Sequence, residues 1–433
     1  MTMTTLHSAL LVLAFTTALF AQHDHHHQQP PPGTYAPNKS TSYLLSFSSG
    51  TSLNPASWPM PMVMTKAAGW HLMWMGQAFL VSTQQSGSRG SDKLYSANWG
   101  MLAAARNIGK GSLMLRGMVS LDPVTVRGKR YPLLFQTGET ADGAPIVDGQ
   151  HPHDAIMELS IHYARPLSIH SVLNVYYAPA GDAALGPVAF PHRASAMELP
   201  QATLGHHWQD ATHITNNVLT LGLTYRTVRF EASSFRGKEP NENRWNIDMG
   251  GMDSWSGRLT WQPSPNWLAQ VSAGHLRRPE TFHLDNVLRT TASLHYTTPA
   301  AGWSTSVIWS RNRKSIGRYA TNSFLAETVR TLTRNNLITA RYEWSQRDEL
   351  FEYDHNLAHE LLLRTGKRAF DVNAFTIGYT RQLRPAGAVR PAAGMNFTAY
   401  AFAGPLKPFY GARPTSVSLF LRFRLHPGEE NHN

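Results

Sequence analysis

The chain has no cysteine, few charged side chains and no long hydrophobic run beyond its first residues. It is 433 residues long, with 15% charged residues, 42% hydrophobic residues and a formal net charge of +11. The absence of cysteine excludes a disulfide scaffold, a cysteine-based zinc site and thiol catalysis. Because soluble globular chains usually contain about 25% charged residues, much of the polarity here must reside in neutral side chains. The 12 Trp, 15 Tyr and 18 Phe argue against a disordered chain.

The first residues predict export. An uncharged start, an apolar run at 9–20 and small residues after it are typical of a signal peptide, which we assign to residues 1–21. The alternative, a membrane anchor, is disfavoured because about 12 apolar residues are too few to span a bilayer as a helix. Residues 22–68 are rich in His, Pro, Ser and Thr and are expected to form a flexible periplasmic leader. Residues 426–433 are expected to form a short tail.

From residue 69 to residue 425, segments of about ten residues alternate apolar and polar side chains. In residues 217–225, for example, Leu219, Leu221 and Leu223 share one face and threonines occupy the other. The same alternation in residues 155–163 places Met157 on the apolar face with Leu159. A period of two residues predicts β-strands with one apolar and one polar face, so the fold class is all-β.

The lengths of the connections sharpen this prediction. Short links, such as 107–111 and 226–228, alternate with longer ones, such as 122–154 and 179–213. This pattern predicts a transmembrane antiparallel β-barrel of about 16 strands, with short periplasmic turns and long extracellular loops. The alternative is a soluble sandwich, barrel or propeller. Aromatic residues at the segment ends and the lack of a blade-length repeat favour the membrane barrel.

A barrel of this kind belongs in the outer membrane. Its expected partners are outer-membrane lipid and lipopolysaccharide, the barrel-assembly machinery, small solutes and further copies of the same chain. Nucleic acid is not expected as a partner, because the basic residues are spread along the strands and no groove-reading motif is present.

Histidine and aspartate are concentrated in two of the long loops. These residues are His151, His153, Asp154, His192, His206, His207, Asp210 and His213. Imidazole and carboxylate at this density suit Cu or Zn as a bound cofactor. In the alternative interpretation, the side chains hydrogen-bond to one another and hold the loops as a constriction in the barrel mouth. No motif with established ligand spacing, such as HExxH, decides between the two interpretations.

The leader contains a second group of candidate metal ligands. Its histidines are His23, His25, His26 and His27, and three methionines follow at alternate positions, Met60, Met62 and Met64. Thioether and imidazole together favour copper. The alternative is a solvated tail without a specific role.

Charged residues on the polar strand faces are expected to line the lumen. They are Arg229, Arg258, Arg289, Arg341, Arg422, Arg424, Glu158, Glu231 and Glu343. Because arginines outnumber glutamates, we expect a porin-like channel that prefers small anionic solutes. The alternative is a set of ion pairs that fills a narrow barrel. A metal-binding or metal-efflux barrel is a second candidate function.

A lipid hydrolase is the third candidate and is not the expected function. His213 is followed by Thr215 and Asn216, which is faintly similar to the arrangement in outer-membrane lipases. The hydroxyl here belongs to threonine, however, and no GxSxG motif occurs in the chain. We therefore predict that the chain is not an enzyme.

Five motifs resemble one group of Gram-negative proteins. They are FQTGET at 135–140, DGQHPHD at 148–154, LGHHWQDATHIT at 204–215, EPNENR at 239–244 and SGRL at 256–259. Together they resemble porin-like outer-membrane barrel proteins, some of which are associated with heavy-metal or copper resistance systems. The resemblance spans about 69–425 and implies a barrel. It supplies no activity that could be transferred to this chain.

Overall fold

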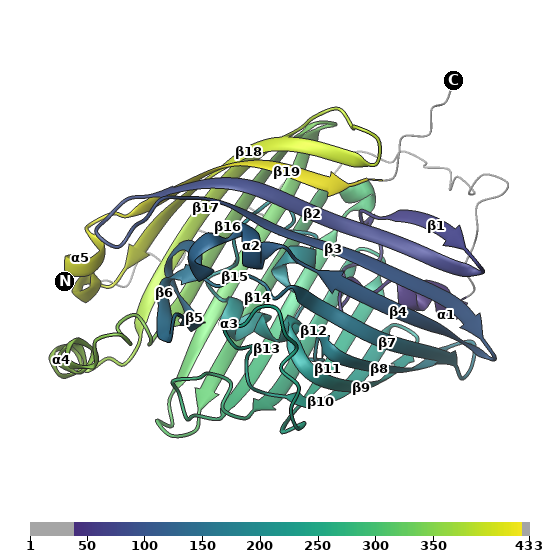
Figure 1. The fold of residues 1–433 in the computed structure, drawn as a ribbon, viewed down its shortest axis with the longest axis horizontal. Coiled ribbons are helices and arrows are strands. Elements are labelled where there is room, and N and C mark those ends of the chain that lie inside the picture. The colour runs from purple at the N-terminus through teal and green to yellow at the C-terminus, as the bar shows by residue number, and fades with distance from the viewer. Residues whose placement is uncertain (1–38, 427–433) are drawn as a thin grey trace. The chain divides into compact units, whose positions relative to one another are not determined.

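The computed structural model describes residues 39–426 and contains a closed antiparallel barrel of 16 strands (Figure 1). The wall strands are β2 (Trp70–Gln85), β3 (Lys93–Ile108), β4 (Gly111–Val119), β7 (Ile156–Pro166), β8 (Ser171–Gly181), β9 (Thr215–Tyr225), β10 (Val228–Arg236), β11 (Ser254–Ser264), β12 (Trp267–Leu276), β13 (Val287–Thr297), β14 (Trp303–Lys314), β15 (Ala320–Thr333), β16 (Asn336–Arg347), β17 (Phe370–Gln382), β18 (Val389–Phe402) and β19 (Thr415–Leu425). The barrel closes where β19 pairs with β2.

The remaining strands and the helices do not belong to the 16-stranded wall. β1 (Val63–Ala67) pairs with the first residues of β2, while β5 (Tyr131–Ala141) and β6 (Ala144–Gln150) form a separate hairpin. The helices are α1 (Lys39–Leu45), α2 (Asp122–Thr125), α3 (His206–Gln209), α4 (His355–Thr365) and α5 (Lys407–Tyr410). The 3-10 turns are η1 (Arg127–Lys129), η2 (Phe190–His192), η3 (Ala211–His213), η4 (Pro299–Ala301) and η5 (Gly404–Leu406). Within residues 39–426, no helix has the length and apolar character needed to cross a membrane.

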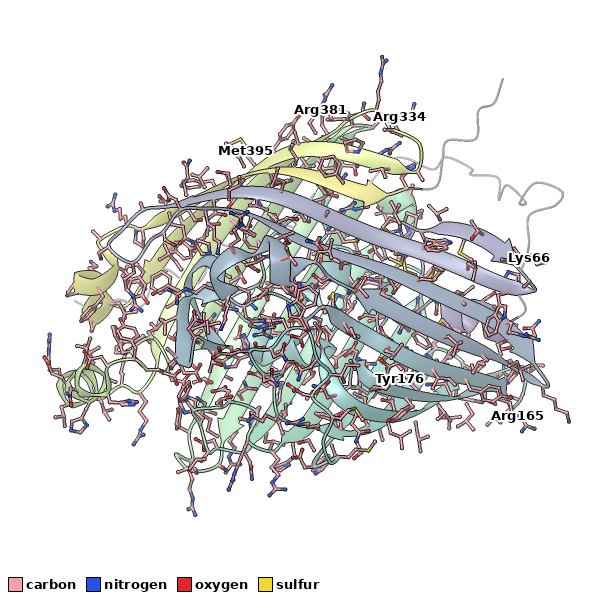
Figure 2. The ribbon with its side chains drawn as sticks, viewed as in Figure 1. Lys66, Arg165, Tyr176, Arg334, Arg381 and Met395 are labelled. Atoms are coloured by element: carbon pink, nitrogen blue, oxygen red, sulfur yellow. The ribbon has the colours of Figure 1, made fainter. Side chains whose placement is uncertain are left out.

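The polarity of the wall is the reverse of that in a soluble barrel: apolar side chains face outward and polar side chains face inward. In β9 the leucines are exposed on the outside, Leu221 by 54%, whereas Thr220 is fully buried inside. Figure 2 shows the side chains on the wall: Met395 of β18 is exposed, and Tyr176 of β8 is buried. Because an apolar exterior of this size is stable only against lipid, the barrel is an outer-membrane protein.

The expected strand number and the alternation of short and long connections are both confirmed. The short turns gather at one end, where the basic side chains Lys66, Arg165, Arg334 and Arg381 lie (Figure 2). The long loops, including those with α4 and α5, gather at the other end (Figure 1). By the general rule for such barrels, the short turns face the periplasm.

One face assignment was wrong. Met157 was expected on the outer face beside Leu159, but it is buried inside the barrel. The cause is a β-bulge: Met118 pairs with Glu158 and Val119 pairs with Ile156, which leaves Met157 as the extra residue. An extra residue interrupts the alternation of side chains between the two faces of the strand, so the side chains of Met157 and Glu158 both point into the barrel.

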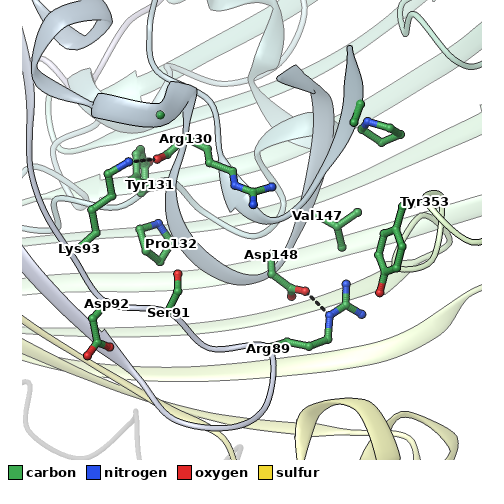
Figure 3. Close-up of a pocket in the computed structure, with 13 residues that line it drawn as sticks. Arg89, Ser91, Asp92, Lys93, Arg130, Tyr131, Pro132, Val147, Asp148 and Tyr353 are labelled. Carbon is green, nitrogen blue, oxygen red and sulfur yellow. Dashed lines mark hydrogen bonds and ion pairs between the residues drawn. The ribbon is translucent and has the colours of Figure 1, made fainter. Parts of the chain in front are cut away.

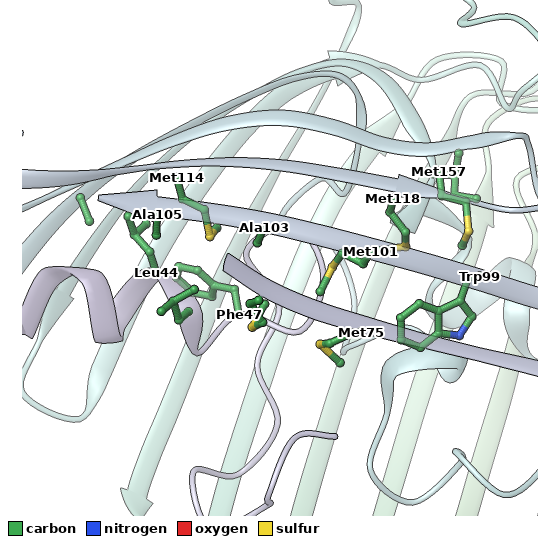
Figure 4. Close-up of a cluster of buried hydrophobic side chains, with 14 of the residues drawn as sticks. Leu44, Phe47, Met75, Trp99, Met101, Ala103, Ala105, Met114, Met118 and Met157 are labelled. Atoms are coloured by element: carbon green, nitrogen blue, oxygen red, sulfur yellow. The ribbon is translucent and has the colours of Figure 1, made fainter. Parts of the chain in front are cut away.

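The described part of the predicted leader differs from the expected flexible tail. Residues 39–62, here called the N-terminal segment, begin with α1, which contacts β3, β4 and β7. Leu44 and Phe47 are fully buried in an apolar cluster of methionines from the wall, with Met60 and Met62 packed against it (Figure 4). The wall methionines of the cluster are Met73, Met75, Met101, Met114, Met118 and Met157, and Met197 joins them from the loop between β8 and β9. The segment is ordered because the methionines offer an apolar surface against which it packs. The sequence of the segment itself does not reveal this surface.

Polar contacts hold the other side of this segment. Tyr43 donates a hydrogen bond to Asn174 of β8 at 2.9 Å. Arg116 of β4 donates to the backbone oxygens of Phe47 and Gly50, at 3.3 and 2.5 Å. The N-terminal segment is therefore part of the lumen filling on the side of β3, β4, β7 and β8.

Candidate functional site

The loop between β8 and β9 fills much of the barrel interior. We call residues 182–214 the plug. Every residue of the plug except Gln201 and Ala211 is buried, and its only regular elements in the described chain are α3 and two 3-10 turns. Burying a loop of this length costs much free energy unless its backbone and side-chain polar groups find hydrogen-bond partners. The partners are side chains of the barrel wall.

Charged groups join the plug to the strands. Arg193 of the plug lies between Asp210, at 3.0 Å, and Glu327 of β15, at 2.6 Å. Glu198 pairs with Arg422 and Arg424 of β19, in the latter case at 2.9 Å. These contacts are fully or almost fully shielded from solvent, so salt screens them little.

Backbone and hydroxyl contacts complete the attachment. The amide of Leu204 donates to Glu343 of β16 at 2.5 Å, and its carbonyl accepts from Arg347. Ser195 lies 2.6 Å from Ser306 of β14, and the Trp208 indole donates to Thr321 of β15 at 2.8 Å. The plug is thus tied to β14, β15, β16 and β19 by side chains and not by strand pairing.

The residues predicted to line the lumen all face the interior, but they are paired. Arg229 and Arg258 share Glu231, at 3.0 and 2.9 Å. Arg341 pairs with Glu327 at 2.9 Å, and Glu158 pairs with Arg116 at 2.8 Å. Arg289 donates to the backbone oxygen of His207 at 2.6 Å, and Glu343, Arg422 and Arg424 contact the plug as described above. The excess of positive charge on the wall is therefore met in part by carboxylates of the plug.

One gap between the plug and the wall is small. A cavity of about 30 Å³ lies between Leu199 and Gln201 of the plug and hydroxyl-bearing residues of β17, β18 and β19, such as Thr398 and Ser418. This is room for water but not for a solute. The plug and the wall thus pack closely at this position, and constriction of the mouth by the histidine-bearing loops stays a prediction.

Three of the predicted histidines converge inside the barrel. His151 follows β6, and His206 and His207 begin α3. One ring nitrogen from each lies within 4.8 Å of the other two, and all three side chains are buried. The ring centres of His151 and His207 are 5.5 Å apart, and those of His206 and His207 are 5.1 Å apart. Residues that are far apart in the sequence are thus brought to one place where α3 meets the loop that contains β5 and β6 (Figure 1).

Each of these histidines uses the same ring nitrogen for a hydrogen bond. Nδ1 of His206 lies 2.7 Å from Asp210, Nδ1 of His207 lies 3.3 Å from Glu239, and Nδ1 of His151 lies 3.1 Å from the backbone oxygen of Pro152. Carboxylates and carbonyls only accept hydrogen bonds, so in each neutral ring the proton is on Nδ1. The lone pair is then on Nε2.

The Nε2 atoms of His151 and His207 have no hydrogen-bond partner among residues 39–426. His151 Nε2 lies 3.0 Å from an oxygen of Glu139, but outside hydrogen-bonding alignment. Glu139 in turn pairs with Arg244. A buried lone pair that faces a carboxylate oxygen without a proton or a cation between them is unfavourable.

Burial and neighbouring charges set the protonation of the three rings. Burial lowers the pKa of His151 well below its usual range, and Arg244 acts in the same direction. Burial also lowers the pKa of His206, by more than the hydrogen bond to Asp210 raises it. Burial acts to lower the pKa of His207 as well, but Glu239, with the charges of Glu139 and Glu349, raises it above the usual value.

The other predicted site residues lie close by but have different partners. His153 pairs with Asp122 at 2.9 Å, and Asp154 pairs with Arg244 at 3.2 Å. His213 uses Nδ1 to donate to the backbone oxygen of Asp210 at 2.9 Å. His192 lies against Trp99, with ring centres 4.3 Å apart. Burial lowers the pKa of His192 to about 3. The leader histidines His23, His25, His26 and His27 lie outside the described residues.

Two acidic residues beside the cluster, and a second acidic group at the mouth, were not predicted. Glu139 and Glu239 face the histidines, and burial raises the pKa of Glu139 to about 7 against the opposing effect of Arg244. At the mouth, single ligand atoms of Glu280, His283 and Glu349 lie within 4.8 Å of one another. Glu139 stands in the same long loop as His151, and that shared location is the signal that could have identified it. Glu239 belongs to the loop between β10 and β11, whose contact with His207 the sequence does not reveal.

A larger cavity opens at the long-loop end of the barrel. Its volume is about 530 Å³, and Arg89, Lys93 and Arg130 are among its lining residues (Figure 3). Arg89 pairs with Asp148 at 2.6 Å, and the Lys93 ammonium donates to backbone oxygens that include that of Arg130. Asp92 and Asp148 also line the cavity, so basic side chains outnumber acidic ones there by three to two.

Solved structures share this fold. OmpF of Salmonella typhi, in complex with daunomycin, is 10% identical over 84% of this chain and 100% of that chain, with a TM-score of 0.52. OprB of Pseudomonas putida is 8% identical over 82% of this chain and 94% of that chain, with a TM-score of 0.51. At such identities the likeness concerns the fold alone. This chain has the fold of Gram-negative outer-membrane porins. No protein-family model and no curated protein sequence matches the chain.

Proposed function

We propose that this barrel is an outer-membrane channel that is closed by its plug and that prefers small anions when the plug leaves the lumen. The observation that carries the proposal is the attachment of the plug. Side-chain contacts alone tie it to the strands named above, so it can move without breaking the barrel's hydrogen-bonded wall.

The preference for anions follows from which charges leave with the plug. Glu198 belongs to the plug, whereas its partners Arg422 and Arg424 belong to the wall. Arg289 would also lose its contact with the His207 backbone. Among the described wall residues, inward arginines then outnumber inward glutamates, and such a lining lowers the barrier for negative solutes.

The cavity at the mouth supports the same preference. Arg130 is exposed beside it, and Arg89 and Lys93 line it. A basic entrance raises the local concentration of anions by electrostatic attraction. The entrance and the wall would thus favour the same class of solute.

The test is a chain in which residues 187–204 are replaced by a short Gly/Ser linker. Folding of the barrel is checked by heat-modifiable migration, and conductance is measured in planar bilayers under a salt gradient. We expect at least a tenfold rise in conductance and a reversal potential of the sign given by anion preference. A matched control shortens the loop at residues 355–365, which carries α4, and should leave conductance near the unaltered value.

Two results would overturn parts of the proposal. A folded deletion variant with unchanged conductance would remove the gating role of the plug. A conducting variant with cation preference would remove the anion preference but retain the channel. That the chain is not an enzyme stays a prediction.

A further inference from the structure

The convergence of His151, His206 and His207 is not used by the channel proposal. Three buried imidazoles in one place require an explanation, because each burial removes hydration from a polar ring. Their Nδ1 atoms already have acceptors, which fixes the tautomer. In metal-binding histidines, the ring nitrogen that does not bind the metal usually donates a hydrogen bond to a carboxylate or a backbone carbonyl, as Nδ1 does here.

We propose that His151, His206 and His207 bind one divalent transition-metal cation through Nε2, with the Glu139 carboxylate beside it. Imidazole nitrogen and carboxylate oxygen are ligands that Zn²⁺ and Cu²⁺ both accept. The chemical class is therefore a borderline divalent cation, and the hard cations Mg²⁺ and Ca²⁺ are excluded by the nitrogen ligands.

The separations fit such an ion after a small adjustment. Two ligands at about 2.1 Å from one ion are about 3.0 to 3.4 Å apart, depending on the angle between them. His151 Nε2 and the Glu139 oxygen are already 3.0 Å apart. One ring nitrogen of each histidine lies within 4.8 Å of the other two, so the Nε2 atoms must be brought together by rotation of the side chains.

The surrounding charge also favours a cation. Asp210 and Glu239 stand behind His206 and His207, and Glu139 faces His151. Arg244 is the nearest opposing charge, and it is itself bound between Glu139 and Asp154. An ion placed among the imidazoles would relieve the repulsion between the His151 lone pair and Glu139.

The site joins two different loops. His206 and His207 belong to the plug, whereas His151 belongs to the loop that contains the β5–β6 hairpin. A bound ion would therefore tie the plug to a second element and hold it in place. This consequence rests on the proposed gating function, but the binding itself does not.

The experiment measures Zn²⁺ and Cu²⁺ binding to the full chain in detergent by titration calorimetry and by elemental analysis. Every sample carries serine at positions 23, 25, 26 and 27, so that the leader cannot contribute imidazole ligands. We expect one ion per chain. His151→Ala and His206→Ala should weaken binding by more than about 100-fold, because even the loss of outer partners costs about 10- to 100-fold. His170→Ala, at an exposed position near a short turn, is the matched control and should bind as before.

His206→Asn tests the same metal ligand if the His206→Ala variant does not fold. Its amide can still donate to Asp210, as Nδ1 does, but it has no equivalent of Nε2. Weak binding by a folded His206→Asn variant supports the site. Unchanged stoichiometry and affinity in the folded His151 and His206 variants would overturn it and would assign these side chains to loop structure. Because no conductance is measured, this outcome leaves the channel proposal standing.

Discussion

The two segments that fill the lumen are held in different ways. The N-terminal segment buries Leu44 and Phe47 in a cluster of methionines. The plug also buries apolar side chains, such as Leu185, Phe190 and Leu204. It differs in its buried charges, with Arg193 between Asp210 and Glu327 as the central contact. Apolar burial stabilises the docked state directly, at about 25 cal/mol per Å². A buried ion pair stabilises it little, because the loss of hydration offsets most of the attraction.

This difference indicates which of the two segments can move. The polar attachment of the plug to the wall depends on a few buried pairs, so the loss of one partner leaves a buried charge that favours release. The N-terminal segment has no charged residue at 40–62 and is expected to remain in place. The plug is therefore the element that a solute, an ion or a single substitution can displace.

The largest effect is expected from Arg193→Ala. The side chain of Arg193 is fully buried, and its removal leaves Asp210 and Glu327 without their shared partner. Breaking a buried pair in this way costs about 3–5 kcal/mol, and this cost falls on the docked state of the plug. Conductance in planar bilayers should rise at least tenfold, and the plug should become open to protease while the barrel stays heat-modifiable.

Two further variants test the cause of that opening. Arg193→Met combined with Asp210→Asn removes the arginine and the carboxylate of the plug, and Glu327 keeps its pair with Arg341. This double variant should restore most of the closure, since no unpaired charge remains. Arg364→Ala removes an exposed pair with Glu360 and should change nothing measurable. If the double variant conducts as strongly as Arg193→Ala, the plug is held by the specific hydrogen bonds and not by charge balance.

Phe47→Ala should affect the other segment and leave the channel closed. The Phe47 ring is buried and stacks on His162, with ring centres 5.0 Å apart. Its loss should destabilise the N-terminal segment locally by about 3 kcal/mol, as expected for a truncated core aromatic. Hydrogen exchange of residues 39–62 should be faster, while conductance stays within twofold of the unaltered chain. A large rise in conductance would show that both segments form one gate.

The pH dependence of Zn²⁺ binding follows from His207. The carboxylates around it raise its pKa above the usual value, so below that pKa the ring is protonated and cannot bind metal. Affinity should therefore increase with pH up to the His207 pKa and fall by about tenfold per pH unit below it. His151 and His206 have lowered pKa values and add no proton competition near neutral pH. Glu139, whose pKa burial raises to about 7, adds a second proton competition in that range. Titrations over a pH series, with Glu239→Gln as the variant that lowers the His207 pKa, would check this.

Much of the wall could be predicted because lipid and lumen impose a strict alternation. The exceptions have local causes. The bulge at Met157 depends on pairing with β4, which no single segment reveals. β15 alternates poorly in sequence because Leu325 and Val329 face the interior of the barrel, where a polar residue was expected.

The candidate site was predicted only as a set of residue types. His151, His206 and His207 could be named, but nothing in the sequence separated them from His153, His192 and His213. The separation depends on how α3 approaches the β5–β6 hairpin, a contact between loops that alternation does not determine. Residues 39–62 escaped prediction for a similar reason, because their binding surface is formed by other strands.

Gly138→Ala should give the smallest effect and the sharpest distinction between the site and the plug contacts. Gly138 has a φ of +120°, and a Cβ there would lie 2.6 Å from Nε2 of His207. The methyl group would occupy the approach to that nitrogen, so Zn²⁺ affinity should fall about tenfold, or about 1.4 kcal/mol. Conductance should hardly change, because the wall contacts of Arg193 and Glu198 are untouched. Gly143→Ala is the matched control: its φ is +74°, but no atom lies within 4 Å of the added Cβ. Equal losses in both variants would attribute the effect to strain in the β5–β6 hairpin, whereas a loss in Gly138→Ala alone would place the ion beside His207.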